Sequence, residues 1–91
     1  MRIRYTETAL VEVKEIFSYL SARNASAAKR VVARVERTIR NLSDVPEMAQ
    51  AADEAGVRRM PVGRYPFIVF YSIEGDEILV LHVRHGARLW P

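Results

Sequence analysis

The spacing of apolar residues changes once along this chain, and that change restricts the fold more than any other feature. Between residues 7 and 42, apolar side chains recur every three or four positions, which is the spacing of helices with one buried face. After residue 57 they form two short runs, at residues 67–73 and 78–83, each with a single polar residue, joined by a turn at 74–76. Helices followed by a block of strands indicate the α+β class.

Two helices joined by a short connection are predicted before residue 43. Residues 2–5 alternate charged and apolar side chains as in a short strand, and Thr6 suits the N-cap of the helix that follows. That helix extends to about residue 22, and Asn24 or Ser26 caps the next one. Because the connection is so short, the two helices are expected to form an antiparallel hairpin. The predicted buried positions are Leu10, Val13, Phe17 and Leu20, with Ile16 beside them, and then Ala28, Val31, Val32, Val35, Ile39 and Leu42.

The rest of the chain is predicted to form an antiparallel meander. Residues 43–55 contain a proline and no clear period, which favours a loop with one turn of helix at 47–51. Pro61 cannot donate to a ladder and therefore indicates an edge strand, whereas the run at 67–73 is apolar on both faces and indicates a central one. We expect a single small domain, residues 1–91, of order β-α-α-β-β-β. Its N-terminal helical hairpin packs on one face of the meander, and the other face stays partly open.

The composition sets expectations for cofactors and compartment. With 49% hydrophobic and 27% charged residues, the chain of 91 residues is globular in character and not disordered. It contains no cysteine, so no disulfide or thiolate metal site is available, which agrees with a reducing cytoplasm. No secretion signal and no apolar run of about 20 residues is visible. We therefore expect a cytoplasmic protein with no cofactor, no bound metal and no membrane partner.

Basic residues near the end of the chain are the candidates for a functional site. The net charge is +3, and the five basic residues after residue 55 are all arginines, which suits bidentate contacts with carboxylate or phosphate. His85 follows the last strand and could transfer a proton, although a hydrogen-bonded surface histidine is the commoner role. His82 and His85 point to opposite faces of a strand, which argues against a metal pair. The candidates for binding a partner are Arg58, Arg64, Tyr65, Arg84, His85, Arg88 and Trp90.

A second set of cations lies in the second predicted helix. Arg30, Arg34 and Arg37 recur at helical spacing on its exposed side, where they could contact nucleic acid. A solvated helix face is the more frequent reason for such a row, and Glu36 reduces its charge. We therefore expect these arginines to be a solvated face.

Four short motifs follow one another along the chain. They read TE-x-A at residues 6–9, AAKRV at 27–31, VRRMPVG-x-YPF at 57–67 and HG-x-R at 85–88. In this order and spacing they resemble the RelE/ParE superfamily of bacterial type II toxins, over nearly all 91 residues. The resemblance implies a toxin, of the kind that stabilises plasmids, which forms a hetero-oligomer with a cognate antitoxin protein. An open, arginine-rimmed face is expected to bind an acidic, amphipathic antitoxin tail.

The superfamily divides by target. ParE-like members inhibit DNA gyrase, whereas RelE-like members are metal-independent ribonucleases that cut mRNA at the ribosome. The closely joined helices, the Tyr65-Pro66-Phe67 run and the lack of a C-terminal tyrosine resemble the ParE branch. The resemblance therefore implies a gyrase inhibitor with no assigned catalytic residue. The alternatives are a non-toxic binding module of the same fold and a RelE-like mRNA endonuclease that uses Arg58, Arg59, His85 and Arg88.

The core assignment yields a direct test. If Phe17 lies in the core, the substitution Phe17→Ala lowers the free energy of unfolding by about 3–5 kcal/mol, because it removes a buried aromatic ring. Urea denaturation measures this loss. A structure in which Phe17 is exposed to solvent contradicts the assignment.

Overall fold

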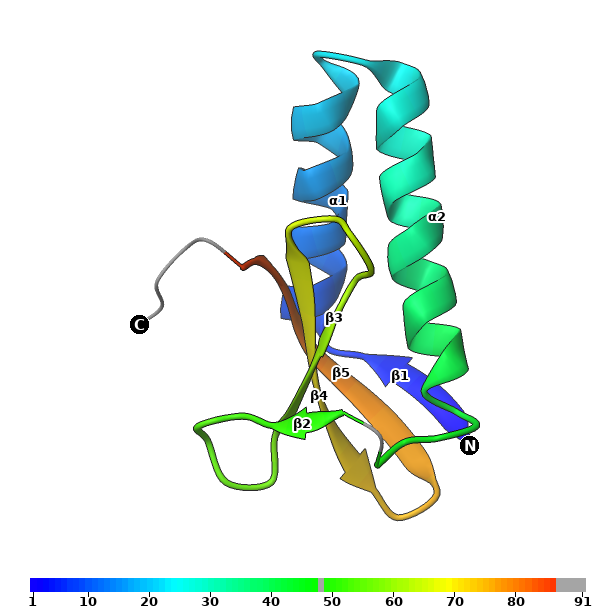
Figure 1. The fold of residues 1–91 in the computed structure, drawn as a ribbon, viewed down its shortest axis with the longest axis vertical. Helices are drawn as coiled ribbons and strands as arrows, with labels where there is room; N and C mark the ends of the chain where they lie inside the picture. Colours follow the sequence, from blue (N-terminus) through cyan, green and yellow to red (C-terminus); the bar gives the residue numbers. More distant parts are fainter. Residues whose placement is uncertain (48, 87–91) are drawn as a thin grey trace.

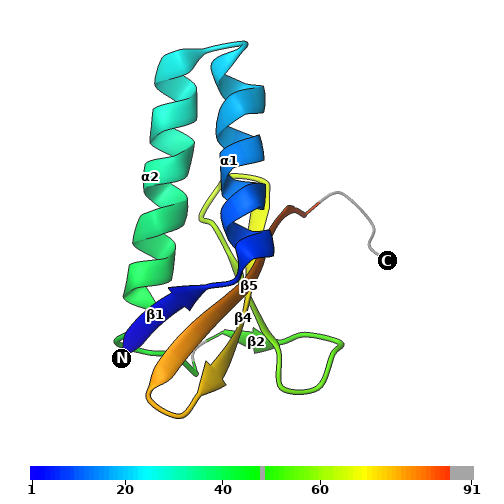
Figure 2. The same ribbon diagram turned by 180° about the vertical axis from the view of Figure 1, so that it is seen from behind.

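The computed structural model describes residues 1–47 and 49–86 and confirms the predicted α+β domain (Figure 1). Two helices stand side by side and extend beyond one end of a twisted sheet (Figures 1 and 2). Arg88 and Trp90, two of the predicted binding residues, lie outside the described residues. The elements are β1 (Arg2–Tyr5), α1 (Glu7–Ser21), α2 (Ala25–Asn41), β2 (Gln50–Ala51), β3 (Arg58–Pro61), β4 (Phe67–Glu74) and β5 (Glu77–His85).

The sheet has the strand order β1-β5-β4-β3-β2, so β4 is central as predicted. Strands β3, β4 and β5 form the expected antiparallel meander. The N-terminal strand β1 pairs parallel to β5, with Ile3 opposite Ile78 and Tyr5 opposite Val80, and crosses beneath both helices (Figure 2). This pairing joins residues about 75 positions apart in the chain, and local periodicity gave no sign of it.

The turn of helix predicted at residues 47–51 was wrong, because the chain forms the short strand β2 there instead. The guanidinium of Arg58 on β3 donates to the carbonyl oxygens of Glu47 (3.3 Å) and Ala49 (3.0 Å), which holds the backbone in an extended path. Strand β2 pairs with Arg58 and Arg59, so only the half of β3 that contains Pro61 is an edge, as expected for a proline. Side chains from distant strands thus decide the conformation of this segment.

The same loop is attached to the central strand by Tyr71. Its side chain is fully buried, and its hydroxyl donates to the carbonyl oxygen of Pro46 at 2.6 Å. Burial raises the pKa of Tyr71 above its ordinary value of 10.0, and the nearby positive charge of Arg58 opposes that rise. The neutral phenol is therefore the form that the fold stabilises.

Both helices begin at the predicted caps. The Thr6 side chain accepts from the backbone N–H of Ala9 at 3.0 Å, and the Asn24 side chain accepts from that of Ala27 at 3.0 Å. Only three residues, 22–24, separate the helices, which makes the antiparallel hairpin as predicted. Its α2 half buries Ala28, Val31, Val35, Ile39 and Leu42 as expected, whereas Val32, also predicted to be buried, is only half-buried.

The predicted core face of α1 was wrong for two residues. Leu10 is 46% exposed and Phe17 is 39% exposed, whereas Ala9 is fully buried. Two apolar stripes at helical spacing run along α1, and both contain Val13 and Leu20. The predicted stripe adds Leu10 and Phe17, whereas the stripe that packs on the core adds Ala9 and Ile16. Small Ala9 lets the first turn of α1 approach the sheet closely, which Leu10 in the same position would prevent. The side chains buried in the core are therefore those that fit between α1 and the sheet, and not the largest apolar side chains of the helix.

Two alanine substitutions test this corrected core. Ile39→Ala removes a side chain that is 1% exposed, so it is expected to lower the free energy of unfolding by about 2–5 kcal/mol. Phe17→Ala is expected to lose less than about 3 kcal/mol, the lower bound for a buried phenylalanine, because its ring is partly in solvent. Urea denaturation compares them, and a Phe17→Ala loss above that of Ile39→Ala contradicts the structure.

Tyr71→Phe tests the loop attachment. Below pH 10 the substitution is expected to lower the free energy of unfolding by about 0.5–1.5 kcal/mol, because the carbonyl of Pro46 loses its donor. Since the fold raises the pKa of Tyr71, the stability of the unsubstituted chain is fully present below pH 10 and declines above it. Denaturation at pH 8 to 11 is expected to show a shallower decline in the variant, with the remainder due to Tyr5, whose pKa burial also raises. Equal slopes above pH 10 contradict this assignment.

Candidate functional site

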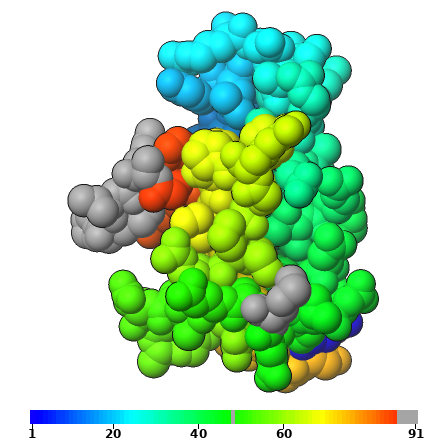
Figure 3. Space-filling view, in the orientation of Figure 1, coloured from blue at the N-terminus to red at the C-terminus, as the bar shows by residue number. Residues whose placement is uncertain are grey.

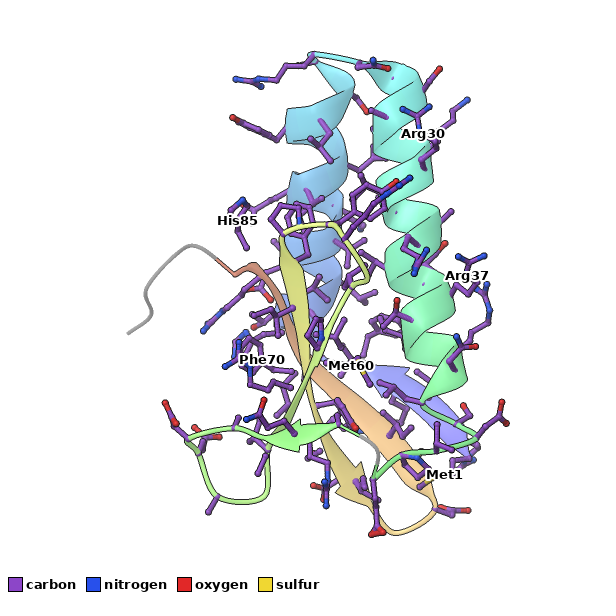
Figure 4. All side chains as sticks on the ribbon, in the orientation of Figure 1. Met1, Arg30, Arg37, Met60, Phe70 and His85 are labelled. Atoms are coloured by element: carbon purple, nitrogen blue, oxygen red, sulfur yellow. The ribbon has the colours of Figure 1, made fainter. Side chains whose placement is uncertain are left out.

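A groove of about 760 Å³ opens between α1 and the adjacent ends of β4 and β5. Tyr65 and Pro66, from the turn before β4, also line it. In Figure 4 the labelled His85 lies beside α1 at the end of β5. The lining residues are Glu12, Glu15, Ile16, Tyr19, Leu20, Val31, Tyr65, Pro66, Phe67, Val83, Arg84 and His85.

The groove has an apolar floor and a rim of both charges. Ile16 and Leu20 of α1 pack against the core beside the buried Phe67 of β4. The ring of His85 meets that of Phe67 edge-on, with centroids 5.5 Å apart and planes at 80°. Two carboxylates, Glu12 and Glu15, stand on the α1 side, and Arg84 and His85 stand on the β5 side. The rim therefore has a basic side, as expected from the sequence, and an acidic side that was not expected.

Glu12 holds α1 against the edge of β5. Strand β1 ends at Tyr5, opposite Val80, so β5 has no strand partner on that side further along. There the Glu12 carboxylate accepts from the backbone N–H of Val83 at 3.0 Å and from Nε of Arg84 at 3.3 Å. The carboxylate thus satisfies a donor that the sheet leaves unpaired, and it does so with an ion pair that is largely shielded from solvent.

His82 completes this network. Its Nδ1 lies 3.3 Å from Oε1 of Glu12, and its Nε2 lies 3.5 Å from Nη2 of Arg84. Polar groups therefore face both nitrogens of the ring and fix its orientation.

A β-bulge decides which residues of β5 face the groove. Tyr71 pairs with Val80 and Phe70 pairs with His82, so Leu81 has no partner on β4. Buried positions accordingly shift from even numbers, as in Val80, to odd numbers, as in Val83. After the bulge, His85 shares the alternation of the buried Val83 and lines the groove, whereas His82 alternates with it and reaches Glu12 at the edge of the strand.

The structure brings together three of the predicted binding residues, which are Tyr65, Arg84 and His85. Arg58 is instead bound to loop carbonyls, and Arg64 is exposed in the turn between β3 and β4 outside the groove. The α1 wall of the groove was missed. Glu12 and Tyr19 gave no signal in the sequence, because their role depends on which strand edge lies beside α1.

The alternative catalytic set consists of Arg58, Arg59, His85 and Arg88. The three of these that lie within the described residues are far apart or point to different faces of the sheet. Arg58 pairs with Tyr71 and His85 pairs with Phe67, so four residues, or about 13 Å, separate them along β4. Arg59 lies beside Arg58 on β3 and therefore points to the other face of the sheet. The described residues include no group of three metal-binding side chains. No helix in this part of the chain has the length and hydropathy to cross a membrane.

Comparison with known sequences identifies the family. The profile of the family described as "ParE toxin of type II toxin-antitoxin system, parDE" matches residues 3–90, so the chain belongs to this family of type II toxins. The protein named "Putative toxin Y4kP" of Sinorhizobium fredii is 32% identical over 90 residues, 99% of this chain and 93% of that protein. "Toxin RelE2" of Caulobacter vibrioides is 26% identical over 88 residues, 97% of this chain and 98% of that protein.

Solved structures share the fold. A chain of the chromosomal ParDE TA system from P. aeruginosa superposes with a TM-score of 0.86 at 20% identity, covering 93% of this chain and 95% of that one. A YoeB/ParE toxin from Agrobacterium tumefaciens superposes with a TM-score of 0.61 at 18% identity, covering 93% and 98%. The arrangement of two helices on a five-stranded sheet is therefore the fold of this superfamily.

Glu12→Ala tests the attachment of α1 to the edge of β5. The substitution leaves the N–H of Val83 without its acceptor and is expected to lower the free energy of unfolding by about 1–3 kcal/mol. Glu15→Ala is the control, since this exposed carboxylate stands on the same wall of the groove, and its loss is expected to change stability by less than about 0.5 kcal/mol. Amide hydrogen exchange at Val83 should accelerate in Glu12→Ala alone. Equal protection of Val83 in both variants contradicts the proposed contact.

Proposed function

We propose that this toxin inhibits DNA gyrase and that a cognate antitoxin neutralises it by binding in the groove. The match to the ParE family over residues 3–90 supports the gyrase target. The superposed P. aeruginosa chain comes from a system named ParDE, which supports a paired antitoxin. The proposal includes a cytoplasmic location, where gyrase acts.

One observation carries the choice of gyrase over RNA cleavage. Metal-free RNA scission needs an acid, a base and cations around one phosphodiester. In the described part of the chain, Arg58 is bound to loop carbonyls about 13 Å along the sheet from His85, and His82 is engaged by Glu12. A toxin that acts by binding needs no such constellation.

The groove fits an amphipathic antitoxin segment. Apolar side chains of a docked helix can replace water over Ile16, Leu20 and Phe67. The mixed rim selects the charges of that helix, since acidic residues suit Arg84 and His85 whereas basic residues suit Glu12 and Glu15. This refines the acidic tail expected from the sequence into a segment with opposite charges on its two sides.

Gyrase inhibition is tested by adding purified toxin, freed of antitoxin, to supercoiling reactions and separately to translating ribosomes. Supercoiling is expected to stop while mRNA stays intact, because inhibition requires binding and not RNA scission. The 26% identity to a protein named RelE2 makes mRNA cleavage the second candidate. Codon-positioned cuts that disappear in His85→Ala, with supercoiling unaffected, would overturn the gyrase proposal.

Antitoxin docking is tested with a matched pair on α1. Tyr19 is 60% exposed and lines the groove, whereas Leu10 is 46% exposed and lies outside it. Tyr19→Ala is expected to weaken binding of the small protein encoded beside the toxin gene by about tenfold or more, as loss of an aromatic anchor does. Leu10→Ala is expected to leave the dissociation constant within about twofold. Titration calorimetry measures both, and equal effects would remove the groove from the proposal.

A further inference from the structure

The positive charge of this chain is concentrated on one helix. Five basic residues and one acidic residue give α2 a charge of +4, whereas nine basic and ten acidic residues elsewhere give −1. The whole net charge of +3 is therefore due to α2. Its cations are Lys29, Arg30, Arg34, Arg37 and Arg40.

These cations lie on the side of α2 that faces away from the core. The helix buries Val31, Val35 and Ile39 on its other side. Figure 4 shows Arg30 and Arg37 projecting away from both α1 and the sheet, and Figure 3 shows no other segment covering this flank of α2 in that view. Since the helix rises 1.5 Å per residue, they stand about 10.5 Å apart along it.

Four of the five cations remain available to a partner. Lys29, Arg30, Arg37 and Arg40 are exposed, and none of them forms an ion pair with a described residue. Arg34 differs, because its guanidinium lies directly over Gly63: a Cβ added there would stand 2.6 Å from Nη2. Glu36 is also exposed on this helix, but none of the four cations is ion-paired with it, so the face keeps a positive potential toward solvent.

The character of this face selects a nucleic acid over a protein. The other exposed side chains of α2 are Ala25, Ser26, Ala33, Glu36 and Asn41, so a protein partner would find no large apolar anchor to bury. Arginine is well suited to phosphate, which it contacts with two parallel hydrogen bonds. A helix with side chains is about 10–12 Å wide and fits the B-form major groove of about 12 Å, whereas the deep, narrow major groove of A-form RNA excludes it.

We propose that the outer face of α2 binds the phosphate backbone of double-stranded DNA, with Arg30 and Arg37 as central contacts and Lys29 and Arg40 beside them. Contacts to phosphates alone give binding without sequence preference. This inference goes beyond the proposed function, since it depends neither on the groove nor on which enzyme the toxin inhibits.

The test measures binding of the full chain, freed of antitoxin, to a fluorescein-labelled 30-base-pair duplex of arbitrary sequence by anisotropy at 50 to 200 mM salt. Three to four phosphate contacts give a slope of log K against log salt of about −2.7 to −3.6, a loss of about 40- to 150-fold across this range. The triple variant Arg30→Gln/Arg37→Gln/Arg40→Gln is expected to flatten the slope by about 2.7. Glutamine is used because it preserves helix propensity.

A charge-matched variant distinguishes this surface from net charge alone. Arg2→Gln/Lys14→Gln/Arg23→Gln removes the same three charges from exposed positions on β1, on α1 and in the connection between the helices. It is expected to retain most of the affinity and the slope of the unsubstituted chain. Thermal denaturation confirms that each variant is folded, and the single variants Arg30→Gln and Arg37→Gln replace the triple if it is not.

Three results would overturn the proposal. The first is absence of duplex binding at 50 mM salt, and the second is equal loss in the two triple variants. The third is tighter binding to single-stranded RNA or to polyglutamate than to the duplex, which would assign the face to RNA or to an acidic protein segment. Gyrase inhibition is measured separately, so either proposal can fail while the other stands.

Discussion

The attachment of α1 to the unpaired edge of β5 is the contact on which the rest of this structure depends. Strand β1 covers that edge only as far as Val80. Immediately beyond it, the hydroxyl of Thr6 donates to the carbonyl of Leu81 at 3.0 Å, and Glu12 accepts from the N–H of Val83. A helix thus takes the place of a strand along the edge, which covers polar backbone groups that would otherwise invite another chain. This contact determines the direction of α1 and therefore the position of the helical hairpin and of one wall of the groove.

The bulge at Leu81 makes this attachment compatible with a packed core. Strand β5 must bury Ile78 and Val80 under the helices and still present Glu12 with a backbone donor further along. An extra residue reverses the alternation, so Val83 is buried and His85 reaches the groove. A single irregular residue therefore links the core of the domain to the lining of the groove.

The sequence predicted those features of the fold that depend on interactions between residues close together in the chain. The caps Thr6 and Asn24, the buried stripe of α2 and the central strand β4 follow from hydrogen bonding or periodicity within a few residues. The strand β2, the buried Ala9 and the edge contact of Glu12 could not be predicted this way. Each depends on a group tens of residues away, whose proximity exists only once the sheet has formed.

The two helices of the hairpin present surfaces of opposite character, and this division limits what each can bind. The groove beside α1 combines an apolar floor with charges of both signs. It therefore favours a partner whose shape and charges are complementary to it. The outer face of α2 has exposed cations and no large apolar side chain. Such a face favours binding of a regular polyanion without preference for its sequence. The groove lies between α1 and the ends of β4 and β5, whereas Arg30 and Arg37 project from the far side of α2 (Figure 4). A segment that fills the groove therefore leaves the cationic face uncovered, so the proposed antitoxin docking and the proposed DNA contact use different side chains.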